Sequence, residues 1–263
     1  MVSDDTEHAL ITLESLLEAD GDLAKFRRSL AKRMRRWFLL LPGGVGLATA
    51  KACLKLCVGF PPDRSGVSSA GNGAAMRAAI IGAFYAEEPD KRVAFVEASS
   101  RITHTDQRAI DGAQLIACAA ACAATGREEA FDSEASQWSP RFAATDEFPN
   151  GVSGFVLHTV PAALGVWRRN PRDLRAAVTE AVEMGGDSDT LAAIVGGIVG
   201  ASTGVEGIPI EWQTGLVEWP RGIEFIRLTA NGSKPTTFWP AVALRNALFL
   251  TVILVHGFRR LIP

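Results

Sequence analysis

The sequence predicts a single all-α domain. Apolar residues recur at helical spacing along most of the 263 residues, and strict alternation of apolar and polar residues is nearly absent. Hydrophobic residues make up 48% of the chain and charged residues 21%, so a sizeable core can form and wholesale disorder is excluded. Neither an internal repeat nor a low-complexity tract divides the chain, so residues 1–263 are expected to form one domain.

The predicted helices follow one another with short breaks. In chain order they cover residues 6–17, 23–40, 45–58, 73–86, 93–102, 107–124, 154–169, 171–184 and 190–202. The turns Asp20-Gly21-Asp22 and Pro42-Gly43-Gly44 separate the first three. We expect residues 131–150 to be irregular, and residues 235–258 to begin irregular and continue as an apolar helix.

Charge and hydropathy exclude several classes of protein. The net charge of −2 excludes a chain that is basic throughout, so binding to nucleic acid is not expected. One predicted helix is locally basic, which we interpret as a solvated face; its basic residues are Arg27, Arg28, Lys32, Arg33, Arg35 and Arg36. The longest apolar stretch, Ala247–Val255, is too short to cross a bilayer, and no signal peptide opens the chain. We therefore expect a cytoplasmic protein without a membrane partner.

The four cysteines form two pairs, Cys53 with Cys57 and Cys118 with Cys122. Each pair is spaced i, i+4 on a predicted helix and so shares one helix face. One interpretation is a four-thiolate zinc site, and the other is small core residues on alanine-rich helices. Zinc knuckles prefer two intervening residues, which favours the core interpretation and reduced thiols.

Two acidic clusters open predicted helices. The first acidic cluster is Ser3-Asp4-Asp5-Thr6, and the second acidic cluster is Asp187-Ser188-Asp189-Thr190. Taken singly, each is interpreted most simply as a helix cap, and Asp4 with Glu7 even fits a capping box. Taken together, four carboxylates facing one another would repel strongly unless a cation neutralised them. Oxygen ligands of this kind suit Mg²⁺, Mn²⁺ or Ca²⁺.

Five motifs occur in the order typical of one family. The family's Thr-Asp-Asp-Thr motif matches Ser3-Asp4-Asp5-Thr6, and its Gly-Gly-Asp-(Ser/Thr)-Asp-Thr motif matches residues 185–190. The Gly-Asn-Gly-x-x-Met-Arg segment matches residues 71–77, a Thr-His pair matches Thr103-His104, and a Val-His-Thr-Val-Pro-Ala type run matches residues 157–162. The chain thus resembles the ADP-ribosylglycohydrolase family, the group related to dinitrogenase reductase-activating glycohydrolase. The matches extend from Ser3 to about Ser202.

The resemblance implies a fold, a cofactor and a reaction. The implied fold is an all-α orthogonal bundle with a two-metal cleft that holds two Mg²⁺ ions, with Mn²⁺ as the other possibility. The implied reaction is hydrolysis of the glycosidic bond that links ADP-ribose to a protein side chain or a small acceptor. The metal ligands carried over from the family are Ser3, Asp4, Asp5, Asp187, Asp189 and Thr190.

The resemblance also implies a substrate site. A glycine loop before a helix exposes backbone N–H groups, so Gly44 and Gly46 are candidates for contact with the diphosphate. The other candidate substrate residues are Ser69, Gly71, Asn72, Gly73 and His104. The remaining histidines, His8, His158 and His256, are expected to lie in the core.

One part of the family pattern is absent. Family members carry a Gly-Asp-x-x-Gly segment and a Glu upstream of the first metal motif, whereas Met1 lies two residues before Ser3. Either the sequence begins inside a longer protein or the chain is a natural short form, so the catalytic carboxylate is left unassigned. Glu7, Asp106 and Asp111 are the candidates to replace it. The alternative function is a non-catalytic ADP-ribose-binding module. The acceptor (arginine, serine, O-acetyl or nucleic-acid linkage) and the oligomeric state are not specified by the sequence.

Overall fold

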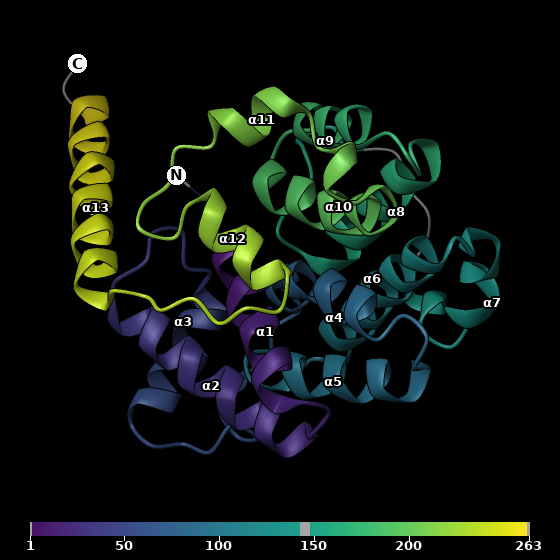
Figure 1. Cartoon of the computed structure of the whole chain (residues 1–263), viewed down its shortest axis with the longest axis horizontal. Helices are drawn as coiled ribbons and strands as arrows, with labels where there is room; N and C mark the ends of the chain where they lie inside the picture. The colour runs from purple at the N-terminus through teal and green to yellow at the C-terminus, as the bar shows by residue number, and fades with distance from the viewer. Residues whose placement is uncertain (1, 143–147, 262–263) are drawn as a thin grey trace.

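Helices make up the regular structure of the computed structural model, which describes residues 2–142 and 148–261, with side chains described up to residue 252 (Figure 1). Strand pairing within these residues is limited to three isolated bridges, Val67 with His104, Gly71 with Phe155 and Val152 with Gly186. The prediction of an all-α fold is therefore confirmed.

The α-helices of the described residues are, in order, α1 (Asp4–Ala19), α2 (Leu23–Leu39), α3 (Leu47–Cys57), α4 (Ala78–Phe84), α5 (Pro89–Arg101), α6 (Gln107–Thr125), α7 (Phe131–Glu134), α8 (Val156–Arg169), α9 (Leu174–Glu183), α10 (Ser188–Thr203), α11 (Ile210–Gly215), α12 (Ile223–Ala230) and α13 (Trp239–Leu261). The 3₁₀ turns are η1 (Asn72–Arg77), η2 (Glu128–Ala130), η3 (Ser139–Arg141) and η4 (Val205–Gly207).

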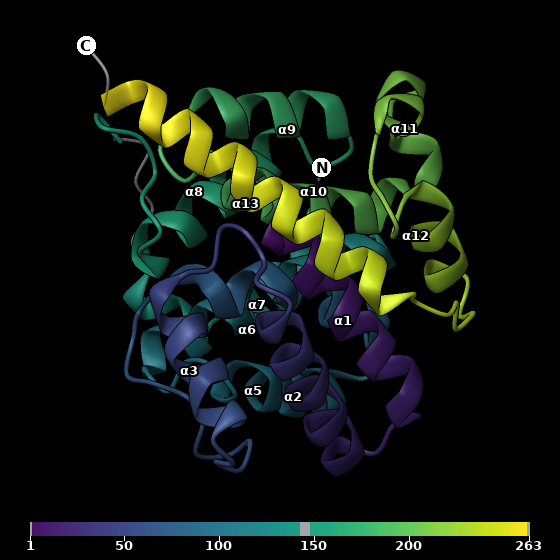
Figure 2. The ribbon, with the colours of Figure 1, turned by 90° about the vertical axis from the view of Figure 1, so that its left-hand side faces the viewer.

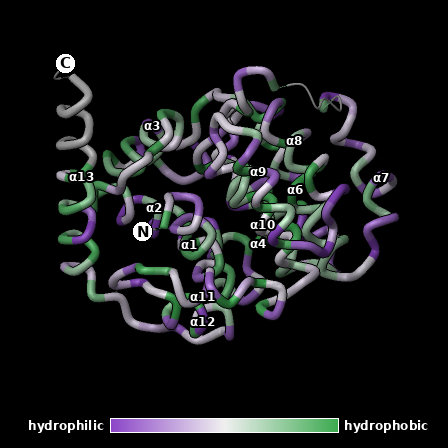
Figure 3. Tube along the Cα trace, turned by 90° about the horizontal axis from the view of Figure 1, so that it is seen from above, coloured by the Kyte–Doolittle hydropathy of each residue, from purple (hydrophilic) through white to green (hydrophobic). Residues whose placement is uncertain are grey.

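Helix α6 forms the centre of the core. Every residue from Ala109 to Ala123 is buried, and the helix packs against α4, α5, α8, α10 and η1. Figure 3 shows its hydrophobic trace inside the molecule. The close approach depends on small side chains, since a Cβ at Gly82 of α4 would collide with the backbone of Ala117. The alanine and glycine content of the sequence thus serves tight helix packing.

Two helices bring the acidic clusters together. Helix α1 packs against α2, η1 and α4, and α10 packs against α9, α6 and α8. The two helices also contact each other near the middle of the molecule (Figure 1). Each cluster begins at the N-cap of its helix, and this packing brings residues of both clusters to the lining of one cavity.

Three segments differ from the sequence prediction. The expected helix 73–86 is divided into η1 and α4, and within η1 the Gly73 carbonyl accepts from the buried Arg77 guanidinium. The expected irregular segment 131–150 contains α7 and η3, although residues 143–147 lie outside the described part. Helices α11 and α12 were not predicted.

Helix α13 lies across the outside of the molecule. Figure 2 shows it running obliquely over the side that carries α1 and α2. Several of its apolar side chains are exposed, among them Leu244, Leu248 and Val252. Among the described helices, neither this one nor any other combines the length and apolarity that a membrane span requires.

Candidate metal centre and substrate cleft

One cavity of about 340 Å³ collects residues from distant parts of the chain. It is lined by Asp4, Gly44, Gly46, Leu47, Ala48, Thr49, Ser69, Gly71, Asn72, Gly73, Met76, His104, Gly154, Asp187, Asp189 and Thr190. Eleven of the thirteen site residues predicted from the sequence are among them, and Ser3 and Asp5 are the two that are not. The fold therefore brings the first acidic cluster, the second acidic cluster and the predicted substrate residues to one place.

Neither acidic cluster caps its helix with a side chain. Ser3 is at the N-cap position of α1, but its hydroxyl donates to Asp5 Oδ2 at 2.9 Å instead of accepting from a backbone N–H. The capping box expected from Asp4 and Glu7 is also absent, because the Glu7 carboxylate accepts from the side chains of Trp37 and Arg245. Asp187 at the N-cap of α10 likewise makes no side-chain cap bond. The simple interpretation of these residues as helix caps is therefore wrong.

Burial and mutual repulsion set the electrostatics of the clusters. Burial, together with the charges of Asp5 and Asp189, raises the pKa of Asp4 to about 7. Burial also raises the pKa of Asp5, although hydrogen bonds from Ser3 and Thr190 oppose the shift. The Asp5 side chain is almost fully buried, yet its Oδ1 has no hydrogen-bond partner. An unpartnered carboxylate oxygen among like charges is the arrangement that a bound cation would stabilise.

The second acidic cluster is held by a short parallel bridge. Val152 accepts from Asp187 N at 2.6 Å, and its own N–H donates to Gly185 O at 3.1 Å. Gly186 has φ +75°, and a Cβ there would collide with the Val152 carbonyl. The bridge therefore requires glycine at position 186, and the positive φ of Gly185 (+68°) favours glycine there as well. Gly154, which lines the cleft here, was missed as a site residue because the sequence marks it only as the start of a predicted helix.

Asn72 connects η1 to the second acidic cluster. Its Nδ2 donates to Asp187 Oδ2 at 2.7 Å and to Thr159 Oγ1 at 3.1 Å. This hydrogen bond opposes the rise that burial causes in the pKa of Asp187. Thr159 lies in the motif of residues 157–162, whose spacing gave no sign that it contacts this site. Asn72 thus orients an acidic residue as well as lining the cleft.

His104 presents one ring nitrogen to the cleft. Its Nδ1 lies 2.8 Å from Thr103 Oγ1, which accepts from the Arg77 guanidinium at 2.6 Å. Burial and the nearby Arg77 charge lower the pKa of His104 to about 3, so the ring is neutral. The Thr103 hydroxyl has one proton and two acceptors in reach, Nδ1 at 2.8 Å and Ser100 O at 3.4 Å. The shorter contact favours donation to Nδ1, which leaves Nε2 protonated. Nε2 lies beside Gly71 and Gly73, where it can donate to a bound molecule.

The glycine loop contacts the first acidic cluster. Gly44 has φ +80°, and a Cβ there would lie 3.2 Å from Asp4 Oδ1. Gly46 is the N-cap of α3 and has no side chain with which to cap it. The next three residues, Leu47–Thr49, also line the cavity. Their backbone N–H groups form a helix N-terminus, which favours an anion.

Other residues predicted from the sequence lie elsewhere. His158 is exposed and contacts Ser153 Oγ at 2.9 Å, so its prediction as a core residue is wrong; it occupies the outer face of α8. His8 is buried as predicted, against the Trp37 ring. His256 falls outside the described side chains.

The three candidate replacement carboxylates are engaged away from the cleft. Glu7 accepts from Trp37 Nε1 at 2.6 Å and from Arg245. Asp106 is paired with Arg108, and Asp111 accepts from Gln107 and from Arg141. These three carboxylates are absent from the residues that line the cavity.

The cysteine pairs do not assemble into a four-thiolate site in the described part of the chain. Cys118 and Cys122 lie with Glu134 as three ligand atoms within 4.8 Å, and Cys53 and Cys57 are not part of that group. Glu134 is already paired with the buried Arg92 at 3.0 Å, so it is engaged as an ion-pair partner. The core interpretation of the cysteines fits this arrangement.

The aspartates of the cleft are more widely spaced than a single-ion cage. Apart from the cysteine group, no three His, Cys, Asp or Glu side chains of the described residues bring ligand atoms within 4.8 Å of one another. Ligands distributed between two ions some 3.5–4 Å apart need not meet that spacing. The donor set of carboxylate and hydroxyl oxygens fits hard divalent ions such as Mg²⁺.

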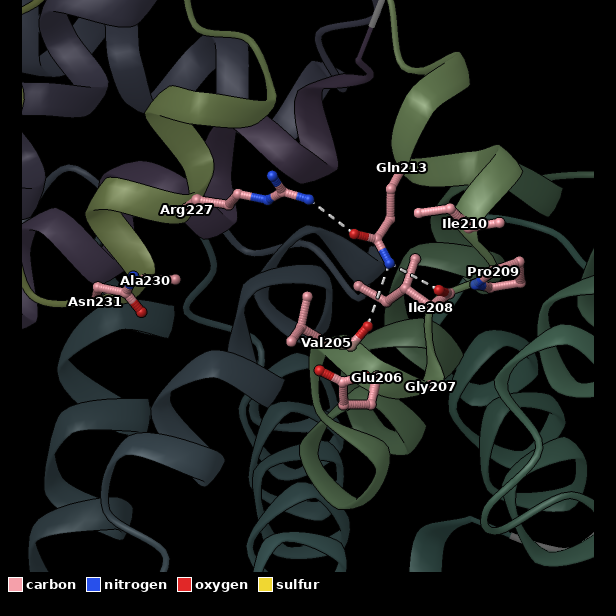
Figure 4. A pocket seen from close by; sticks show the side chains of 10 residues that line it. All are labelled: Val205, Glu206, Gly207, Ile208, Pro209, Ile210, Gln213, Arg227, Ala230 and Asn231. Atoms are coloured by element: carbon pink, nitrogen blue, oxygen red, sulfur yellow. Dashed lines mark hydrogen bonds between the residues drawn. The ribbon is translucent and has the colours of Figure 1, made fainter.

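A larger cavity of about 690 Å³ lies beside α11 and α12 (Figure 4). Gln213 bridges it, donating to Ile208 O at 2.8 Å and accepting from Arg227 at 2.9 Å. The polar side chains of Gln213 and Arg227 in this cavity therefore bind each other. None of the residues that line this cavity was predicted from the sequence as a metal ligand or substrate contact.

Comparisons with known proteins identify similar chains. A family model described as ADP-ribosylglycohydrolase matches residues 1–235. An uncharacterized protein of Archaeoglobus fulgidus is 34% identical over 236 residues, covering 81% of this chain and 75% of the relative. The ADP-ribosylarginine hydrolase Tri1 of Pseudomonas putida is 27% identical, covering 84% of this chain and 64% of the relative.

Further similarity extends to an animal enzyme and a solved structure. The ADP-ribosylhydrolase ARH3 of Bos taurus is 27% identical, covering 80% of this chain and 73% of the relative. A solved structure described as an ADP-ribosylglycohydrolase-related protein complex superposes with a TM-score of 0.65 at 26% identity, covering 94% of this chain and 81% of the other.

Proposed function

The chain belongs to the ADP-ribosylglycohydrolase family of hydrolases, and from this membership we propose that it cleaves the glycosidic bond between ADP-ribose and a protein side chain. The observation that carries the proposal is the single cavity in which both acidic clusters meet the glycine loop, Asn72 and His104. Two relatives whose names specify ADP-ribosyl hydrolysis support it.

The proposed metal ligands are Ser3, Asp4, Asp5, Asp187, Asp189 and Thr190, and the proposed cofactor is a pair of Mg²⁺ ions, with Mn²⁺ as a substitute. The unpartnered Asp5 Oδ1 and the raised pKa of Asp4 support a cation at this place. Bound Mg²⁺ would supply Lewis acidity toward the ribose hydroxyls and a water. Within the protein, Asn72 holds Asp187 in a fixed orientation.

The proposed substrate contacts follow from the donors that line the cleft. The N-terminal turn of α3 and the loop at Gly44 offer backbone N–H groups to the diphosphate. His104 Nε2–H donates to a ribose hydroxyl or a phosphate oxygen, since the short Thr103 contact favours the tautomer protonated at Nε2. Gly71 and Gly73 border this nitrogen and let the substrate approach the backbone.

One observation favours a second candidate function. Among the described residues that line the cavity, the only carboxylates are Asp4, Asp187 and Asp189, all three assigned to the metals. Cleavage of a glycosidic bond is normally assisted by a carboxylate that moves a proton, which contributes about 10²–10⁴-fold in rate. The second candidate is therefore an ADP-ribose-binding module with slow or no turnover.

Release of ADP-ribose from modified peptides separates the two candidates. Peptides with ADP-ribosylated arginine or serine would be incubated with the chain in Mg²⁺ or in EDTA, and free ADP-ribose affinity measured by calorimetry. The hydrolase proposal predicts Mg²⁺-dependent release from at least one peptide, lost in Asp189→Asn and retained in Asp106→Asn, whose carboxylate faces Arg108 away from the cleft. Binding without release from either peptide would contradict it and support the module.

A further inference from the structure

The residue before the first acidic cluster is held by side chains from the opposite end of the chain. Val2 N donates to Glu218 Oε2 at 2.6 Å, and Val2 O accepts from Arg245 Nη2 at 3.2 Å. Glu218 and Arg245 bind each other through two contacts of 3.0 and 3.1 Å. Both backbone groups of Val2 are thus fixed by one ion pair that lies more than two hundred residues away in sequence.

The same arginine also reaches the far side of the first turn of α1. Arg245 Nη1 donates to Glu7 Oε1 at 3.1 Å, and Trp37 Nε1 donates to Glu7 Oε2 at 2.6 Å. The side chains of Arg245, Glu218 and Glu7 are 7%, 3% and 11% exposed. One guanidinium therefore contacts the residues on both sides of Ser3-Asp4-Asp5 from within the protein.

This cluster has no room for a ligand. The cavity enclosed by Val2, Glu7, Glu218 and Arg245 measures about 10 Å³, which is about the space of a single water. Its charged groups are paired with one another. The cluster is therefore a packing and hydrogen-bonding device, separate from any pocket of its own.

The next residue of α13 holds the other wall of the cleft. Asn246 Nδ2 donates to Leu40 O at 2.8 Å, at the start of the loop that carries Gly44 and Gly46. Arg245 and Asn246 are also joined at 2.8 Å. Both residues follow residue 235, where the match to the family model ends. The first turns of α13 thus tie together the two segments that border the first acidic cluster.

We propose that Arg245, together with Glu218, is a positioning residue for the metal centre and sets the place of Ser3, Asp4 and Asp5 by clamping Val2 and Glu7. The proposal rests on the proposed function, because it takes these residues as metal ligands. Ser3 lies in extended backbone and makes no cap bond, so the clamp supplies the restraint that the helix end lacks. Groups that orient metal ligands typically change metal affinity 10–100-fold when removed.

The test is Mn²⁺ affinity, followed by electron paramagnetic resonance, alongside thermal unfolding in EDTA. Arg245→Met should raise the Kd for Mn²⁺ at least about 10-fold, and Arg245→Lys should recover part of it, because a lysine can bind one acceptor at a time. Glu218→Gln, which retains the side-chain shape, should raise the Kd several-fold. If Arg245→Met does not fold, the Mn²⁺ affinity of Glu218→Gln tests the proposal in its place.

Arg221→Met is the matched control. Arg221 is a buried arginine that pairs with Glu14 at 3.0 Å, two turns further along α1. It borders the same small cavity as Arg245, and its charge acts on Glu7, but its side-chain hydrogen bond is to Glu14 and not to Val2, Glu7 or Glu218. The comparison therefore isolates the hydrogen bonds that Arg245 makes. The substitution Arg221→Met should lower the thermal midpoint about as much as Arg245→Met does, and it should leave the Kd for Mn²⁺ unchanged.

Two results would contradict the proposal, and they differ from each other. If Arg245→Met and Arg221→Met change the Kd for Mn²⁺ equally, or if Arg245→Met does not change it, Arg245 contributes only to the stability of the fold and does not position the metal ligands. Failure of the unsubstituted chain to bind Mn²⁺ would instead overturn the metal centre of the proposed function, and the positioning role with it.

Discussion

Replacing Asp4 with asparagine should stabilise the metal-free protein at alkaline pH. Burial and neighbouring carboxylates raise the pKa of Asp4 from 3.8 to about 7, so the folded state is penalised when this group is ionised. The native state then binds more protons than the unfolded state between about pH 4 and pH 7, and stability decreases as the pH rises through that window. Asparagine carries no charge and removes the penalty.

The size of the effect follows from the shift. A difference of about 3 pH units corresponds to at most about 4 kcal/mol. Asp4 is only partly buried, and solvent screening reduces the expected gain to about 1–2 kcal/mol at pH 8. In a chain of this size that corresponds to an increase of a few degrees in the unfolding midpoint.

Thermal unfolding in EDTA at pH 4.0 and pH 8.0 measures the effect. Asp4→Asn should match the unsubstituted chain at pH 4.0 and exceed it at pH 8.0. Added Mg²⁺ should raise the midpoint of the unsubstituted chain at pH 8.0, since a ligand that binds only the folded state stabilises it, and should do little for the variant. Asp106→Asn is the control of opposite sign, because hydrogen bonds from Arg108 lower the pKa of Asp106.

Two outcomes would refute the reasoning. A lower midpoint for Asp4→Asn than for the unsubstituted chain at pH 8.0 in EDTA would show that Asp4 is stabilising when ionised without a metal. An equal gain from Mg²⁺ in both proteins would show that Asp4 does not contribute to a cation site.

Three further predictions concern the cleft. Asn72→Ala should slow ADP-ribose release by about 10–100-fold by freeing its carboxylate partner in the second acidic cluster, and an unchanged rate would remove that role. Gly44→Ala should weaken ADP-ribose binding and destabilise the fold by about 1 kcal/mol because of its positive φ. Gly46→Ala has open space and no positive φ, so it should weaken binding and leave the unfolding midpoint unchanged; wild-type calorimetric affinity in both variants would contradict the loop assignment. Thr103→Val should release the tautomer of His104, seen in imidazole ¹⁵N shifts, and raise the Kd for ADP-ribose about 10-fold; unchanged shifts would show that the hydroxyl does not set the tautomer.

The acidic clusters were predictable from the sequence because each one is local. Two carboxylates and a hydroxyl within four residues exceed what a helix cap needs, and the structure shows that neither cluster caps its helix. Their meeting was not predictable from spacing, because it depends on the packing of α1 against α10. The motif order supplied that step through the family resemblance.

The features of the site that were not predictable from the sequence are polar contacts between residues far apart in the chain. The bond from Asn72 to Asp187 spans 115 residues, and the bond from Arg245 to Val2 spans 243. The hydrophobic periodicity of the sequence does not indicate such a contact, because each partner is an ordinary polar residue within its own segment. For His158 the error is the opposite one. Its apolar sequence neighbours led to a prediction of burial, whereas the residue lies on the outer face of its helix.

The most direct measurement of the central claim is the anomalous diffraction of crystals grown with MnCl₂ and ADP-ribose, with data collected at the manganese edge. We expect two anomalous peaks between the first acidic cluster and the second acidic cluster, within bonding distance of Asp4 and Asp187. The density of the ADP-ribose diphosphate should lie beside Gly44 and the start of α3. An empty space between the clusters, or manganese bound only at Cys118, Cys122 and Glu134, would contradict it.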